Sequence, residues 1–237
     1  MAVHFVVLDM SIRTSRRSTI LTKTAAVLCA ESPDRTLSDR IIVYGATDKD
    51  EIAKGGTNGW AERKKLLLVE RLKHSATKKA IFYDDTKKNI LVAEKEPNIH
   101  AVLVNWEVCA NKEVGDQVLV EFETAPHCAI RDHLNAYRNK HAVGLIAFDF
   151  DRTLVSCHTG GTPDVEEFLK NGTLHRSLAE DGEIYGGTAS TEEMNGVGLF
   201  LLDLLQKEKN VIIVTRGIQS RVQEVIDRLI QRMRTVY

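Results

Sequence analysis

The chain has 237 residues, of which 43% are hydrophobic and 27% are charged, and this is enough for one large globular domain with a sizeable core. Lys and Arg number 32 and Asp and Glu 33, so bulk charge does not indicate nucleic-acid or membrane binding. The 4 cysteines form no CxxC pair, and the apolar run at the start is short. We therefore expect a reduced, soluble, cytoplasmic protein with no membrane association.

Strands and helices are predicted to alternate along the chain. Apolar, β-branched runs predict strands at residues 3–8, 41–44, 80–83, 100–104, 117–122, 145–148 and 211–214. Helical spacing of apolar residues predicts helices at 17–31, 61–74, 128–139, 190–207 and 218–234. Continuous apolar strands between helices are typical of a parallel sheet covered on both faces. The expected fold is a three-layer, Rossmann-like α/β domain.

Three local features add detail to this outline. Ser190 and Glu193 form an S-x-x-E capping box at the start of one predicted helix. Residues 156–189 are rich in glycine turns and poor in large apolar residues, which indicates an inserted loop or a small cap. His127 and His133, at the predicted helix 128–139, are expected at the surface.

The chemistry is expected where the strands end. Asp84 and Asp85 follow one apolar run, and Asp149 and Asp151 follow another. Ligands of open parallel sheets bind at the carboxyl ends of strands, so these carboxylates should meet there. Gathered carboxylates need a cation, and an oxygen-only ligand set suits Mg²⁺, which implies a phosphate. A simple turn with Asx hydrogen bonds is the alternative for the Asp84 pair.

Two carboxylates at one strand end suit phosphate ester hydrolysis. Asp149 could attack phosphorus and form an acyl phosphate. Asp151, two residues along, could protonate the leaving oxygen and then activate water. The hydroxyl of Thr215 and the ammonium group of a lysine at a helix start would hold the phosphoryl oxygens and stabilise the charge during transfer.

Four segments together resemble the haloacid dehalogenase (HAD) superfamily of phosphatases. D-F-D-R-T-L at 149–154 is similar to the first motif of that family, and VIIVT, ending at Thr215, is similar to the second. IFYDD at 81–85 is similar to the fourth, metal-binding motif, and Lys64 or Lys65 lies where the lysine of the third motif should be. The resemblance covers about residues 40–104 and 141–237.

The order of the motifs departs from that of the family. There the DxD motif comes first and the lysine and acidic pair come last, whereas here the lysine and acidic pair precede Asp149. The sequence therefore resembles a circularly permuted member, which is physically possible when the natural chain ends lie close together. Residues 105–144 would then join the two halves, with a strand and a helix added to a single domain spanning 1–237.

The resemblance assigns roles to particular residues. Asp149, the backbone carbonyl of Asp151, and an acidic residue from the Asp84–Asp85 pair would hold Mg²⁺. Thr215 and a lysine would bind phosphate. We favour Lys64 over Lys65, because Leu68 and Leu72 at i+4 and i+8 fix its helix face. Arg216, next to Thr215 at the start of the last predicted helix, could also reach a phosphate.

The resemblance indicates the class of substrate only broadly. The insertion at 156–189 is modest, and family members with little or no cap tend to accept large substrates, so a phosphoprotein or a nucleic acid end is expected. The alternatives are a small-metabolite phosphatase and a phosphate-binding scaffold without turnover, although binding alone does not need Asp151. No oligomeric state follows from the sequence.

Overall fold

A computed structural model describes residues 41–75, 77–106, 110–121, 124–157, 165, 177–178, 184–185, 191–207 and 210–236. The strand expected at 3–8, the helix expected at 17–31, and Ser190 of the predicted capping box lie outside the described residues. The other predicted strands and helices can be compared with the structure.

The centre of the fold is a six-stranded parallel sheet with the order β1-β8-β5-β2-β3-β4. The strands are β1 (Ile41–Ala46), β2 (Ala80–Asp84), β3 (Ile99–Asn105), β4 (Asp116–Leu119), β5 (Leu145–Phe148) and β8 (Val211–Ile218). All four residues of β5 and all five of β2 are buried, as their continuous apolar sequences predict. The strand that precedes Asp149 therefore lies in the middle of the sheet, between β8 and β2.

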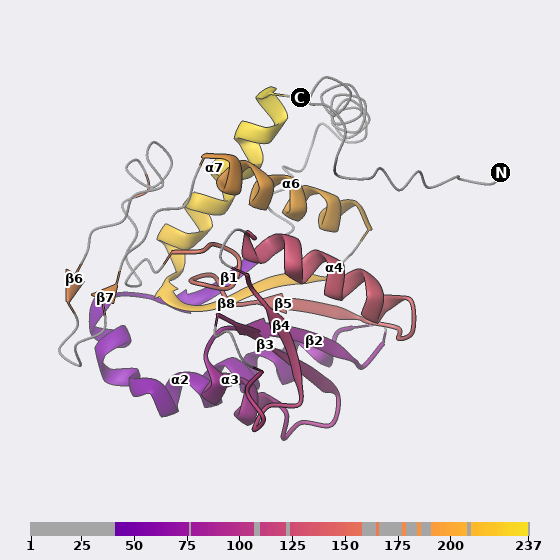
Figure 1. Cartoon of the computed structure of the whole chain (residues 1–237). Helices are drawn as coiled ribbons and strands as arrows, with labels where there is room; N and C mark the ends of the chain where they lie inside the picture. The colour runs from indigo at the N-terminus through magenta and orange to yellow at the C-terminus, as the bar shows by residue number, and fades with distance from the viewer. Residues whose placement is uncertain are drawn as a thin grey trace.

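Helices cover both faces of this sheet (Figure 1). One face carries α2 (Lys49–Leu72) and α3 (Lys87–Ala93), which pack on one apolar cluster. The other face carries α4 (Pro126–Arg138), α6 (Thr191–Lys207) and α7 (Gln219–Val236), which pack on a second cluster. The predicted three-layer, Rossmann-like α/β arrangement is confirmed. Within the 156–189 segment, the short strands β6 (Ser177–Leu178) and β7 (Ile184–Tyr185) pair antiparallel.

Helix α2 is longer than predicted, since it begins at Lys49 rather than near residue 61. The glycines of the intervening segment favoured a loop, and each costs about 1 kcal/mol in a helix. A strong cap opposes this cost. The side chain of Asp48 accepts a hydrogen bond from the N–H of Glu51 at 2.8 Å, and the Glu51 carboxylate accepts from the backbone N–H of Thr47 at 2.6 Å.

Strand β8 is also longer than predicted, because it continues to Ile218 instead of ending near residue 214. The reason lies in its partner. Tyr44 pairs with Val214 and Ala46 pairs with Ile218, so two positions of β1 correspond to four of β8, and the extra residues form a bulge in β8. Arg216 is therefore an exposed residue of β8, and the last helix begins at Gln219, one residue after its predicted start.

Replacing Gly45, which lies opposite this bulge, with alanine should destabilise the protein. A Cβ atom there would lie 2.3 Å from the carbonyl oxygen of Gly217 and 3.0 Å from the backbone nitrogen of Gln219, so backbone would have to shift. We expect the free energy of unfolding to fall by about 1–3 kcal/mol in urea denaturation. The control is Gly59→Ala in α2, where a Cβ meets nothing within 4 Å, so that variant should be unchanged or more stable. Equal stability of the two variants would contradict this account.

The segment 105–144 contributes a strand and a helix, as expected. Strand β4 pairs in parallel with β3 at the edge of the sheet, although it is shorter than the predicted 117–122. The expectation of a surface position is wrong for His127, which is buried, whereas His133 is half-buried, with 21% of its side chain exposed. His127 is 5% exposed, and burial together with the charge of Arg131 lowers its pKa to about 4. Its ring packs against α6, where a Cβ on Gly196 would lie 2.4 Å from Nε2.

A hydrogen-bonded chain connects this added strand and helix to the core. His100 Nε2 and His133 Nε2 lie 2.7 and 3.0 Å from the same oxygen of Asp116. The Tyr83 hydroxyl lies 2.9 Å from His133 Nδ1. Because an ionised carboxylate only accepts, His133 donates from Nε2 to Asp116, and its Nδ1 contacts the hydroxyl of Tyr83, whose pKa burial raises. The chain thus links β2, β3, β4 and α4.

Replacing Asp116 with asparagine should therefore weaken the docking of β4 and α4. The hydrogen bonds from His100 and His133 hold the pKa of Asp116 below its ordinary value. The stability that they contribute is thus present above the unfolded-state pKa of about 4 and is lost as the pH falls below it. At pH 7 we expect a loss of about 1 kcal/mol, because the side chain is 36% exposed and solvent weakens the interaction.

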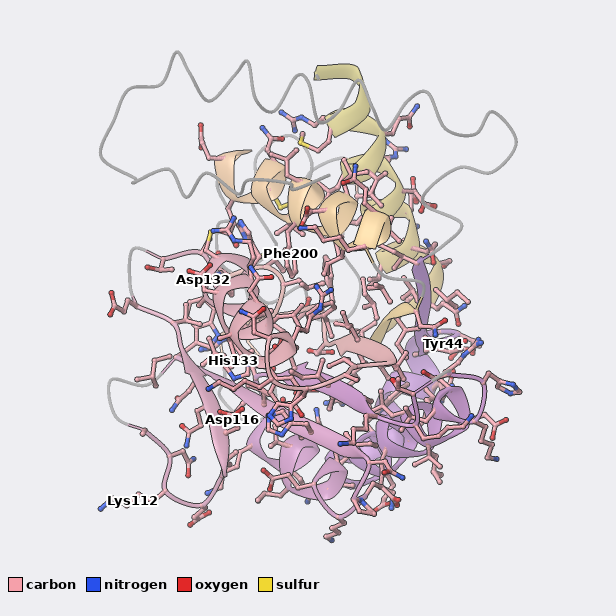
Figure 2. All side chains as sticks on the ribbon, turned by 90° about the vertical axis from the view of Figure 1, so that its right-hand side faces the viewer. Tyr44, Lys112, Asp116, Asp132, His133 and Phe200 are labelled. Carbon is pink, nitrogen blue, oxygen red and sulfur yellow. The ribbon has the colours of Figure 1, made fainter. Side chains whose placement is uncertain are left out.

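The measurement is urea denaturation at pH 7 and at about pH 3. Over that interval the wild type should lose stability that the Asp116 carboxylate contributes, whereas Asp116→Asn has no such contribution to lose. Asp132→Asn is the matched control, because Asp132 lies on α4 beside His133 but its side chain is 76% exposed (Figure 2). A wild type and an Asp116→Asn variant with the same dependence of stability on pH would contradict the assignment.

Candidate functional site

Three carboxylates meet at the carboxyl ends of the central strands. Asp84 is the last residue of β2, and Asp149 directly follows β5. Tyr83 pairs with Phe148, so the register places Asp84 beside Asp149. Asp84, Asp85 and Asp149 each offer a ligand atom, and these atoms lie within 4.8 Å of one another. The structure thus brings together Asp84 and Asp149, which are 65 positions apart in the sequence.

Lys64 joins this group from helix α2. Its Nζ lies 2.7 Å from Asp84 Oδ2 and 2.7 Å from Asp149 Oδ1, and the residue is 3% exposed. Leu68 and Leu72, on the same helix face, are buried, as predicted. Burial alone would lower the pKa of Lys64, but the charges of Asp149 and Asp84 and the hydrogen bonds to them hold it above the ordinary lysine value. The ammonium group is therefore permanently charged.

Lys65, the alternative lysine, lies elsewhere. Its Nζ is 2.7 Å from Glu62 and 4.0 Å from Glu96. Of the two candidates, the structure brings only Lys64 to the acidic group.

Asp84 is also held from helix α3, which the sequence did not predict. Asn89 Nδ2 donates to both carboxylate oxygens, at 2.9 and 3.0 Å, and the backbone N–H of Thr86 donates to Oδ1 at 2.8 Å. The Thr86 bond is the Asx turn considered as the alternative for this pair, so the turn and the acidic group coexist. Asn89 is 7% exposed, and its role depends on this burial, which the sequence does not show.

The acidic group has the composition of a site for a hard cation. Burial raises the pKa of Asp149 well above its ordinary value, and Asp84 and Asp85 raise it further against the opposing effect of Lys64. Three carboxylates carry more negative charge than one ammonium group compensates. An oxygen-only donor set of this kind suits Mg²⁺. These residues fit the metal that the sequence predicted, and Asp84, Asp85 and Asp149 are the side chains that could hold it.

Asp151 lies in the turn after β5 and is buried. Among the residues that the structure describes, the acidic group that could hold a metal ion contains Asp84, Asp85 and Asp149, so the Asp151 side chain is not part of it. Burial, and then the carboxylates of Asp151 and Glu193, raise the pKa of the Cys157 thiol. Cys157 is therefore a protonated packing residue, and Asp151 follows the acidic group along the chain without belonging to it.

The turn is anchored on both sides. Arg152 has a positive φ of 52°, and its N–H donates to the carbonyl of Cys157 at 3.0 Å. Glu193, from the predicted capping box, accepts hydrogen bonds from the N–H and hydroxyl of Ser156 at 2.6 and 2.7 Å. These bonds attach the segment after Asp151 to helix α6.

Thr215 lies in β8, the strand on the other side of β5. Ile213 pairs with Phe148, so Thr215 is two residues beyond the register position of Phe148, at the same edge as Asp149. It is 2% exposed, and its Oγ1 accepts a hydrogen bond from the N–H of Gly217 at 3.0 Å. Arg216, the next residue, is exposed. The register therefore brings Thr215, as predicted, to the edge where Asp149 lies.

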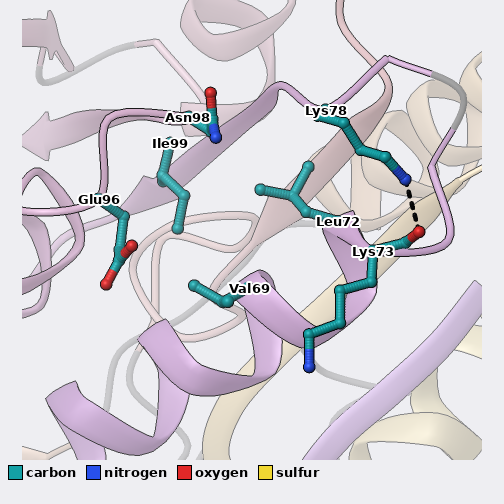
Figure 3. A pocket seen from close by; sticks show the side chains of 7 residues that line it. All are labelled: Val69, Leu72, Lys73, Lys78, Glu96, Asn98 and Ile99. Atoms are coloured by element: carbon teal, nitrogen blue, oxygen red, sulfur yellow. Dashed lines mark hydrogen bonds between the residues drawn. The ribbon is translucent and has the colours of Figure 1, made fainter.

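A pocket of about 380 Å³ lies away from this site (Figure 3). Its walls are the end of α2, at Val69 and Leu72, and the entry to β3, at Asn98 and Ile99. This is the amino end of the strand, whereas the carboxylates follow the carboxyl ends. The pocket is therefore not part of the acidic site.

The fold and the site define a Rossmann-like α/β protein with a buried acidic group that could bind a metal ion. A comparison of the chain with protein families, curated proteins and solved structures finds no match. No helix in the described part of the chain has both the length and the apolar character needed to cross a membrane.

Proposed function

We propose that the chain is a Mg²⁺-dependent phosphomonoester hydrolase of the circularly permuted HAD type. The observation that carries this proposal is the position of the Lys64 ammonium group, 2.7 Å from both Asp84 and Asp149, within a group of three carboxylates. The resemblance was identified from four segments in an unusual order, and the strand before Asp149 lies between the strands of Asp84 and Thr215. Permuted motifs must converge in this way if they are to form one site.

The first step would use Asp149 as the nucleophile. Its carboxylate oxygen attacks phosphorus, the bond from phosphorus to the ester oxygen breaks, and Asp151 gives its proton to that leaving oxygen. Lys64 and Thr215 would hold the phosphoryl oxygens and oppose their negative charge. Mg²⁺, held by Asp84, Asp85, Asp149 and the backbone carbonyl of Asp151, would supply further neutralisation of the phosphoryl charge.

The second step would release phosphate. Asp151, now a carboxylate, takes a proton from water as the water oxygen attacks the acyl phosphate. The bond between Asp149 and phosphorus breaks, which restores the carboxylate and yields inorganic phosphate. The short 156–189 insertion in the sequence favours large or exposed substrates, such as a phosphoprotein or a nucleic acid end.

The proposal is tested by phosphate release from p-nitrophenyl phosphate. We expect Mg²⁺-dependent release by the wild type, loss of release in EDTA, and a fall of at least about a thousandfold in Asp149→Asn, because asparagine cannot act as the nucleophile. Asp203→Asn is the control, since that exposed residue pairs with Lys207 on α6. No release by folded, Mg²⁺-loaded wild type, even from phosphopeptides and 3′-phosphorylated oligonucleotides, would overturn the proposal in favour of a binding module.

A further inference from the structure

An arginine occupies a strained position beside the acidic site. Arg152 follows Asp151 with a φ of 52°, in the left-handed region that disfavours residues with a Cβ. Glycine would adopt this conformation without that cost. Backbone strain of this kind persists where the surroundings fix it, and it gathers at functional sites.

The surroundings hold Arg152 from two directions. The indole Nε1–H of Trp106 donates to the carbonyl of Arg152 at 2.7 Å, and the N–H of Arg152 donates to the carbonyl of Cys157 at 3.0 Å. Trp106 follows β3 and packs partly on the core, so the turn after β5 is tied to the end of another strand. These two hydrogen bonds fix the backbone of Arg152 and therefore the point at which its side chain leaves the turn.

The guanidinium group of Arg152 lies at the edge of the acidic group, next to Asp85. Its central carbon lies 5.4 Å from the centre of the Trp106 ring, and Nε lies 4.0 Å from Asp85 Oδ2. A separation of 4.0 Å is longer than a hydrogen bond, so this ion pair leaves the N–H donors available to a ligand. The side chain is 44% exposed, so a ligand can approach it from solvent.

We infer that Arg152 is a specificity residue, and that the substrate is a phosphate ester carrying a second phosphate group near the one that reacts. An arginine stacked on an aromatic ring presents a planar fork of donors, which matches the oxygens of a phosphate. Because the guanidinium group of Arg152 lies next to Asp85, it would face a second phosphate beside the reacting one rather than the phosphate at Asp149 itself. The inference rests on the proposed function only in placing the reacting phosphate at Asp149.

The test is calorimetric binding of two ligands that differ only in the second phosphate, thymidine 3′,5′-bisphosphate and thymidine 3′-phosphate, in Mg²⁺. The protein is the full chain with Asp149→Asn, so that no turnover disturbs the heats. We expect the bisphosphate to bind about tenfold more tightly or better, which is the usual strength of a charge-assisted hydrogen bond. Adding Arg152→Asn should reduce this ratio to about threefold or less.

Two further variants separate a specific role from a general one. Asparagine tolerates a positive φ, so Arg152→Asn should retain the turn. Arg152→Lys keeps the charge without the planar fork, and it should lose most of the preference. Arg228→Met is the control, because Arg228 lies on α7, pairs with Glu224 at 2.9 Å and has a side chain that is 41% exposed. It should keep the full ratio.

Three results would overturn the inference: no preference for the bisphosphate, no measurable binding of it, or a ratio unaffected by Arg152→Asn. Hydrolysis of p-nitrophenyl phosphate by the wild type together with any of these would leave the proposed function standing. If the preference for the bisphosphate depends on Arg152 but the wild type shows no turnover, the inference about Arg152 stands and the proposed hydrolase function is overturned.

Discussion

Replacing Lys64 with methionine is expected to lower the free energy of unfolding by about 3 kcal/mol or more in the absence of metal. Removing one partner of a buried ion pair leaves the other charge without compensation, which usually costs about 3–5 kcal/mol. Here Lys64 faces Asp84 and Asp149 at 2.7 Å, and both are buried. Asn89 still holds Asp84 in the variant, whereas Asp149 loses the ion pair with Lys64 that offsets its burial.

The neighbouring lysine provides a matched control. Lys65→Met removes the same number of charges from the same helix, but Lys65 pairs with Glu62 and Glu96 rather than with the acidic group. We expect a much smaller change in urea denaturation for that variant. Phosphate release should also fall by about a hundredfold or more in Lys64→Met alone, because a charge that stabilises the transition state is lost. Equal losses in the two variants would mean that Lys64 has no special role.

Mg²⁺ is expected to stabilise the folded protein, whatever its effect on turnover. A ligand that binds only the folded state at one hundred times its dissociation constant adds about 2.7 kcal/mol to the free energy of unfolding. The physical reason is the repulsion among Asp84, Asp85 and Asp149, which a divalent cation would relieve. Thermal unfolding in EDTA and in increasing Mg²⁺ measures this effect.

Asp85→Asn is the informative variant for the metal. Asp85 offers a ligand atom but takes no part in the Lys64 ion pairs, so its replacement removes a ligand while leaving Lys64 bonded to Asp84 and Asp149. We expect this variant to need about tenfold more Mg²⁺ for the same rise in melting temperature. Asp203→Asn, on α6, should respond as the wild type does. An identical response of Asp85→Asn and the wild type would remove Asp85 from the site.

Much of the sheet and part of the site could be predicted, because continuous apolar runs mark buried parallel strands. The run at 145–148 became β5 with the predicted ends. Polar residues directly after such runs must lie at one edge, which brought Asp84 and Asp149 together. Lys64 could be chosen over Lys65 since the i+4 and i+8 leucines fix which side of α2 faces the sheet.

The features that the sequence did not predict depend on contacts between distant segments. The glycines after Lys54 favour a loop, and only the cap at Asp48 and Glu51 shows why a helix begins there. Strand β8 continues past its apolar run because Ile218, beyond the bulge in β8, pairs with Ala46 of β1. Asn89 lies on a helix too short to show periodicity, and the half-buried position of His133 on α4 depends on Asp116 of β4.

The central claim is that Asp149 forms a covalent phosphoryl intermediate, and trapping that intermediate tests it most directly. In Asp151→Asn, p-nitrophenolate can still leave as the anion without a proton donor, but the water that should release the phosphate lacks its base. The acyl phosphate should therefore accumulate on mixing with p-nitrophenyl phosphate and Mg²⁺. Borohydride reduces an acyl phosphate to an alcohol, and peptide mass spectrometry then locates the residue. We predict homoserine at position 149, and none in EDTA or in an Asp149→Asn chain. Turnover by the wild type with the modification at another residue, or with none, would contradict the assignment of Asp149 as the nucleophile.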